Sequence, residues 1–86
     1  ELGLVSRLVE PGDATDEALR LAEQITANAP LAVWESRKVV LASEYEDDET
    51  LKKMTNSAMG TVMSSEDLKE GLTAFIEKRP PEWTGR

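Results

Sequence analysis

Carboxylates are the only side chains in this 86-residue chain numerous enough to suggest acid–base chemistry, with 17 Asp and Glu. The acidic pairs considered for such chemistry are Asp47-Asp48, Glu66-Asp67 and Glu70 with Glu77. Adjacent residues on a helix do not face each other, and Glu70 and Glu77 lie two turns apart. Solvation or salt bridges account for these carboxylates, although Glu70 could reach inward beside Gly71. We therefore predict no catalytic residue in this chain.

Histidine and cysteine are both absent from the sequence. Their absence removes the commonest general base, the commonest metal ligand and every Ser-His or Cys-His nucleophile arrangement. The acidic residues lack calcium-loop spacing, and the five glycines are scattered rather than gathered in a phosphate-binding loop. We expect no metal site and no bound cofactor.

The charge balance limits the classes of partner. The formal net charge is -7 and no basic stripe is present, so the surface repels nucleic acid and anionic membranes. No apolar run approaches the ~20 residues that span a bilayer, and no signal-peptide pattern opens the chain. The lack of cysteine is typical of a reducing compartment. We expect a cytoplasmic location without nucleic-acid or membrane partners.

Helical apolar spacing and start signals predict an all-α fold of about four helices. The predicted ranges are 14–28, 30–46, 48–63 and 65–78. The start signals are Asp13 or Thr15, Pro30, Asp47 or Asp48, and Ser64 or Ser65. The residues expected to face inward are Ala18, Leu21, Ala22 and Ile25 in the first helix, Val33, Val40 and Leu41 in the second, and Leu51, Met54, Ala58 and Val62 in the third.

The last helix carries further signals. Leu68, Leu72, Phe75 and Ile76 share one face. Gly71 lies in its middle, where glycine costs roughly 1 kcal/mol relative to alanine. Such a glycine predicts a close approach of another group. Pro80-Pro81 prevents continuation of the helix, and we expect Trp83 to anchor the tail on a helix or a neighbouring subunit.

Residues 1–12 form the other predicted unit. The segment from Leu2 to Val9 is apolar and partly β-branched, which indicates an extended arm or strand that stops at Pro11-Gly12. A lone strand has no partner in this chain. The first residue is Glu rather than Met. We therefore expect a larger segment, missing here, to precede the arm.

The order of motifs resembles the C-terminal end of the enoyl-CoA hydratase/isomerase (crotonase) family. The matching residues near the end are Ser65, Asp67, Glu70-Gly71, Ala74-Phe75, Glu77-Lys78-Arg79-Pro80, Trp83 and Gly85-Arg86. The opening, Glu1 to Val5, resembles the segment that leaves the catalytic core of the family. The run from Asn28 to Ala32, followed by Lys38, resembles the helix junction.

The resemblance implies that the catalytic groups lie in a core that is missing here and that this chain has a different role. In the family, a spiral α/β core holds the oxyanion hole and, in hydratases, the paired glutamates. Residues 13–86 would then be a helical subdomain that packs subunits into a trimer or dimer of trimers and helps close an acyl-CoA site. The parent reaction would be hydration of trans-2-enoyl-CoA in fatty acid metabolism. The chain alone would self-associate and be inactive.

Two residues receive a binding role from the resemblance. Phe75 matches the family phenylalanine that borders the CoA or acyl chain of the adjoining subunit, and a core anchor is the alternative. Lys78 matches the family lysine that approaches CoA phosphate, and neutralisation of the helix end is the alternative. Met59 falls where some members place an aromatic residue, and core packing is the favoured interpretation for it.

A different class remains as an alternative, namely a stand-alone acidic helical interaction module or an acyl-carrier-like protein. Acyl carriers share this length, acidity and helix number. They attach phosphopantetheine to a serine within an Asp-Ser-Leu signature at a helix start. Neither the run from Asp47 to Leu51 nor the run from Ser64 to Leu68 matches that signature.

Overall fold

The computed structural model describes residues 2–86 and contains four α-helices. They are α1 (Ala14–Thr26), α2 (Pro30–Ala42), α3 (Asp48–Met63) and α4 (Glu66–Glu77). The described residues form no strand, which confirms the all-α prediction. The predicted range 48–63 is confirmed. The ranges 14–28, 30–46 and 65–78 were too long at one or both ends.

Side-chain caps explain where several helices begin and end. The Asp47 carboxylate accepts a hydrogen bond from the Thr50 N–H at 2.8 Å and starts α3. Ser43 Oγ donates to the Val40 carbonyl at 2.6 Å, and α2 ends at that point, four residues before the predicted boundary. Asp13 precedes α1 but makes no side-chain cap hydrogen bond, so α1 lacks the cap that the sequence suggested.

Ser65 caps α4, since its Oγ accepts a hydrogen bond from the Leu68 N–H at 3.1 Å. The same oxygen donates to the Val62 carbonyl at 2.6 Å, so it links the end of α3 to the start of α4. We predict that Ser65→Ala lowers the free energy of unfolding by about 1 kcal/mol. Urea denaturation followed by circular dichroism measures the loss. Ser64→Ala is the matched control, and an equal loss in both variants would contradict the assignment.

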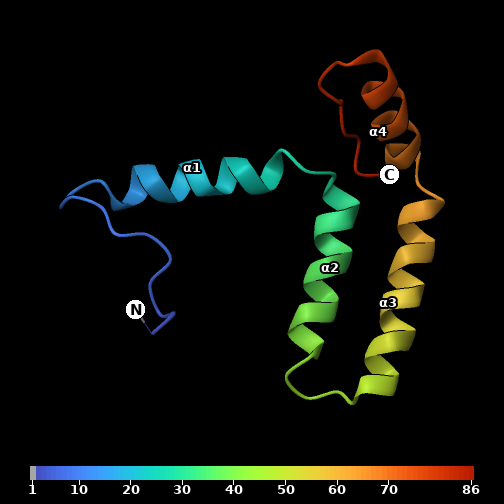
Figure 1. The fold of residues 1–86 in the computed structure, drawn as a ribbon, viewed down its shortest axis with the longest axis horizontal. Helices are drawn as coiled ribbons and strands as arrows, with labels where there is room; N and C mark the ends of the chain where they lie inside the picture. The colour runs from blue at the N-terminus through green and yellow to red at the C-terminus, as the bar shows by residue number, and fades with distance from the viewer. Residues whose placement is uncertain (1) are drawn as a thin grey trace.

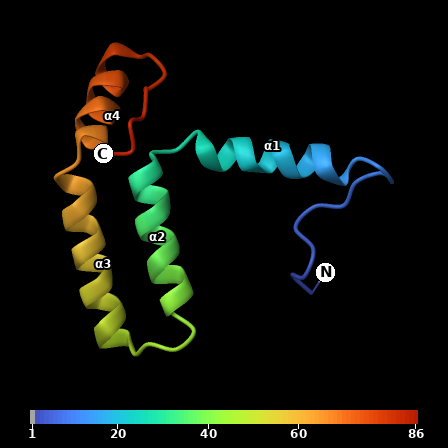
Figure 2. The ribbon, with the colours of Figure 1, turned by 180° about the vertical axis from the view of Figure 1, so that it is seen from behind.

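The helices form an L-shaped arrangement (Figure 1). α2 and α3 run antiparallel side by side, α4 stands beyond the end of α3, and α1 projects away from the α2–α3 pair, as both views show (Figure 2). The apolar face of α3 packs toward α2. Its residues Leu51, Met54, Ala58 and Val62 are half-buried, which supports the predicted inward face of that helix.

The molecule is much more open than an isolated domain of this size. Its radius of gyration is 16.5 Å, against about 12 Å for a compact chain of equal length. Its accessible surface is 7309 Å², against about 5,000 Å² for a compact monomer of equal mass. Ala42 and Ala74 are the only buried hydrophobic residues among those described. The chain therefore lacks a closed hydrophobic core of its own.

This openness corrects two of the predicted inward faces. No residue of α1 is buried, so the stripe that contains Leu21 and Ile25 is exposed, because no other helix packs along it. Val40 and Leu41 of α2 are also exposed rather than inward, and the Val40 residue is 66% exposed. Val40 instead lines an open groove along α2 and α3.

The N-terminal arm, described from residue 2, forms an irregular segment beside α1 rather than a strand. Arg7 forms an ion pair with Glu17, and its other terminal nitrogen donates to Gln24 Oε1 at 3.0 Å. These contacts hold the arm to one helix and leave its leucines exposed. Across residues 2–86, every helix is too short or too polar to serve as a membrane span.

Candidate functional site

The predicted site residues Phe75 and Lys78 lie together at the C-terminal end of α4. Phe75 is 84% exposed, Ile76 is 77% exposed and Leu72 is 57% exposed. These three residues form the α4 apolar face, which no part of the described chain covers. Phe75 is therefore not buried within the described chain, and its role, as a ligand contact or as a core anchor, stays a prediction.

Lys78 ends α4 in the left-handed conformation, with φ 54° and ψ 46°. It is the only non-glycine residue with positive φ among residues 2–86. Two hydrogen bonds close the helix end around it: the Lys78 N–H donates to the Phe75 carbonyl at 3.3 Å, and the Arg79 N–H donates to the Ala74 carbonyl at 3.0 Å. A side chain in this conformation costs about 1–2 kcal/mol, so the backbone is strained at the predicted phosphate-binding residue.

Replacement of Lys78 by glycine should relieve this strain. We predict that Lys78→Gly raises the free energy of unfolding by about 1 kcal/mol, because glycine adopts positive φ without steric penalty. Urea denaturation of the purified chain measures the gain, and Lys78→Ala, which keeps the strain, is the matched control. Equal stability of the glycine and alanine variants would contradict the strain assignment.

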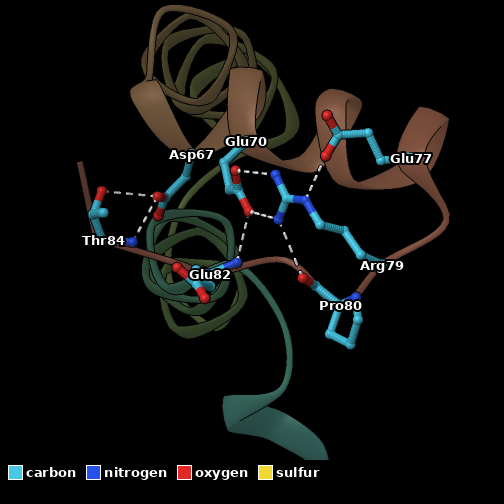
Figure 3. A network of polar contacts seen from close by, with 7 residues as sticks. All are labelled: Asp67, Glu70, Glu77, Arg79, Pro80, Glu82 and Thr84. Carbon is cyan, nitrogen blue, oxygen red and sulfur yellow. Dashed lines mark hydrogen bonds and ion pairs between the residues drawn. The ribbon is translucent and has the colours of Figure 1, made fainter.

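The segment after α4, residues 79–86, folds back along that helix and is called the tail below (Figure 3). Arg79 forms a bidentate ion pair with Glu70, with distances of 2.6 Å and 3.0 Å, and its Nε donates to Glu77 at 2.6 Å. The Glu82 N–H adds a hydrogen bond to Glu70 at 2.8 Å. The Arg79 guanidinium and then the Glu82 N–H lower the pKa of Glu70 to about 2. Glu70 is thus salt-bridged, as its preferred interpretation predicted.

Asp67 holds the far end of the tail, and only 2% of this residue is exposed. Its carboxylate accepts hydrogen bonds from the Thr84 N–H at 2.8 Å, the Thr84 hydroxyl at 2.9 Å and the Gly85 N–H at 2.8 Å. The Asp67 N–H donates to the Arg86 carbonyl at 2.8 Å. The hydrogen bond from the Thr84 N–H is the main reason that the pKa of Asp67 lies below its ordinary value.

Along the tail, Trp83 lies between the two points at which the tail is held, namely the Arg79–Glu70 ion pair and the hydrogen bonds to Asp67. A Cβ at Gly71 would lie 3.2 Å from the Trp83 ring, so glycine permits the ring to rest directly on α4. This contact confirms the close approach predicted at Gly71. The Trp83 Nε1–H donates to the Ala27 carbonyl at 3.0 Å, at the junction between α1 and α2. The tail therefore joins α4 to the start of the helical pair.

The chemistry available in this arrangement is binding rather than proton transfer. Asp67 and Glu70 are both occupied as acceptors for the tail. Within residues 2–86 no three metal-ligating side chains gather into a site. Lys78 has no ion-pair partner within 4 Å in that same range. An ammonium group and an exposed aromatic ring one helical turn apart can hold a phosphate and an apolar group.

Sequence reasoning did not find the roles of Arg79 and Asp67 in holding the tail. Arg79 and Glu70 are nine residues apart across a helix end, and no local spacing rule pairs them. Met59, for which core packing was favoured, is exposed and lines the groove along α2 and α3, so that interpretation was wrong within this chain. The binding roles of Phe75 and Lys78 stay predictions.

Comparison with known proteins identifies relatives of this chain. The family model described as enoyl-CoA hydratase/isomerase matches residues 1–86. The chain is 41% identical to the carnitinyl-CoA dehydratase of Proteus mirabilis, covering 98% of this chain and 34% of that protein. It is 38% identical to the short-chain-enoyl-CoA hydratase of Clostridium acetobutylicum, covering 94% of this chain and 31% of that protein.

Solved structures agree with this result. The crystal structure of enoyl-CoA hydratase EchA1 from Mycobacterium marinum matches 99% of this chain with a TM-score of 0.92 at 45% identity, and the match covers 35% of that chain. An enoyl-CoA hydratase from Mycobacterium tuberculosis matches equally well, with 34% of its chain covered. The chain thus spans about a third of the length of the proteins that it matches.

Proposed function

Because the chain belongs to the enoyl-CoA hydratase/isomerase family, we propose that it is the C-terminal helical part of an acyl-CoA-processing subunit. In this proposal, residues 1–12 lead out of a catalytic core that lies outside this chain. Residues 13–86 join subunits and help to close the acyl-CoA site. The parent reaction is hydration of trans-2-enoyl-CoA in fatty acid metabolism, in the cytoplasm.

The openness of the molecule carries this proposal. The chain exposes about 2,300 Å² more surface than a compact monomer of its mass. The excess includes the stripe on α1, the groove along α2 and α3 and the α4 apolar face. Large exposed apolar patches are rarely left in water. A core and sister subunits would cover it, and the high structural similarity to a third of whole family members supports that arrangement.

The proposed ligand contacts lie at the end of α4. Lys78 binds a CoA phosphate as a point charge, and Phe75 borders the CoA or acyl chain bound in the adjoining subunit. Both side chains are available for this purpose, since Phe75 is exposed and Lys78 has no ion-pair partner in the described chain. The core would supply all groups that stabilise charge or transfer protons. The family match over residues 1–86 favours this proposal over the acyl-carrier-like alternative.

A hydration assay tests whether catalysis requires the core that lies outside this chain. The purified 86-residue chain should show no crotonyl-CoA hydration above background. A chimera in which these residues replace the matching third of the Mycobacterium marinum protein should hydrate crotonyl-CoA if that protein does so. Turnover by the 86-residue chain alone would overturn the proposal, and so would an inactive but folded chimera of an active parent.

Sedimentation tests the proposed assembly surfaces. The isolated chain should self-associate in a concentration-dependent manner, because its apolar faces lack their normal partners. The chimera should form a trimer or a dimer of trimers. Ile76→Lys, on the α4 apolar face, should weaken association of the isolated chain, whereas Lys52→Gln on exposed α3 serves as a control. A monodisperse monomer at high concentration would contradict the assembly role.

A further inference from the structure

We infer that Arg79 is a positioning residue for Lys78: clamped by Glu70, it fixes the direction of the lysine and keeps its ammonium group unpaired for CoA phosphate. This inference rests on the proposed CoA contact of Lys78. It assigns a purpose to the Glu70–Arg79 pair (Figure 3), of which Arg79 directly follows Lys78 in the chain.

The first argument is geometric. Lys78 lies between two fixed points of backbone. On one side, its N–H and that of Arg79 are bound to carbonyls of the last turn of α4. On the other side, the Arg79 side chain is bound to Glu70 through two hydrogen bonds, and Pro80 follows with its restricted φ. The strained conformation of Lys78 is thus held from both sides, which sets the direction in which its side chain leaves the helix.

The second argument concerns charge. Glu77 ends α4 and Glu70 lies two turns earlier on that helix, and Arg79 contacts both carboxylates, at 2.6 Å in each case. A carboxylate without this partner would attract the ammonium group of Lys78 away from an anionic ligand. The bidentate geometry that holds Glu70 is specific to a guanidinium, since a lysine supplies only a point charge. Arg79 therefore neutralises the surroundings of Lys78 in addition to fixing its backbone.

The test compares two thioesters in the chimera described above. Crotonyl-CoA carries the phosphates, whereas crotonyl-pantetheine lacks them. Arg79→Gln should raise the KM for crotonyl-CoA about five-fold, the contribution of one exposed ion pair, with kcat nearly unchanged. The KM for crotonyl-pantetheine should stay the same. Arg79→Lys should recover only part of the loss. Lys53→Gln breaks the Glu49 ion pair on α3 and is the matched control.

Lys78→Ala distinguishes the two levels of the proposal. It should raise the KM for crotonyl-CoA selectively, and the double variant Lys78→Ala/Arg79→Gln should lose no more than Lys78→Ala alone. An unchanged KM in Lys78→Ala would overturn the proposed phosphate contact itself. A selective effect of Lys78→Ala, combined with additive losses in the double variant or equal losses on both thioesters in Arg79→Gln, would overturn only the positioning role.

Discussion

Replacement of Trp83 by alanine should lower the free energy of unfolding by about 2–3 kcal/mol. The indole covers Gly71 of α4 and its Nε1–H binds the Ala27 carbonyl, so the substitution removes ring packing and a hydrogen bond together. For a chain of this size the midpoint of thermal unfolding should fall by roughly 10 °C or more. Thermal and urea denaturation followed by circular dichroism measure both quantities.

Two companion variants separate the contributions. Trp83→Phe keeps most of the ring contact but removes the donor, so it should cost only about 1 kcal/mol. Gly71→Ala should stabilise the chain by about 1 kcal/mol in the Trp83→Ala background, where helix propensity alone acts. In the presence of Trp83 the added Cβ would crowd the ring, so this gain should shrink or vanish. Equal effects of Gly71→Ala in both backgrounds would show that the ring does not rest there.

Acid should loosen the tail before it melts the helices. The folded pKa of Glu70 is about 2, below its ordinary value of 4.5, and that of Asp67 is also lowered. Groups with a depressed folded pKa contribute stability that is fully present above the ordinary pKa and is lost as the pH falls through the folded pKa. The urea midpoint should therefore be steady above about pH 5 and decline between pH 4.5 and pH 2.

The control for this prediction addresses net charge. Protonation of an acidic chain also relieves self-repulsion, which would raise stability in acid, and the net charge here is -7. Glu70→Gln removes the titrating anchor with little change in size, so its decline below pH 4.5 should be shallower than that of the parent chain. Glu66→Gln, at the exposed start of α4, should leave the decline intact. A urea midpoint that rises on acidification would contradict the tail assignment.

The helices were predictable because their signals are local. Asp47 and Ser65 cap the helices that the sequence assigned to them, and Pro30 starts α2. The ends of α1 and α2 were placed too late because single backbone hydrogen bonds, such as that from Glu46 to Ala42, continue helical spacing for a few residues beyond each helix. The exposed stripe of α1 was mispredicted as buried, because an amphipathic pattern states that a partner exists but not whether it lies in the same chain.

The candidate site was predictable only in part. Gly71 signalled a close approach, but nothing local identified the Trp83 ring as the group that approaches it. The return of the tail depends on the left-handed conformation of Lys78, a residue that rarely adopts it. The pairing of Arg79 with Glu70 requires that turn, and no sequence pattern predicts the pairing. Residue types could therefore suggest ligand contacts at the helix end, but not the network that supports them.

Both tryptophans of the chain touch the tail. Trp83 belongs to it, and the ring of Trp34 on α2 lies 3.5 Å from the position that a Cβ would take at Gly85. The protein therefore carries its own optical reporters, since detachment of the last residues would change the surroundings of both indoles at once. Intrinsic tryptophan fluorescence and its quenching by acrylamide can follow the attachment and detachment of the tail in real time, without any attached dye.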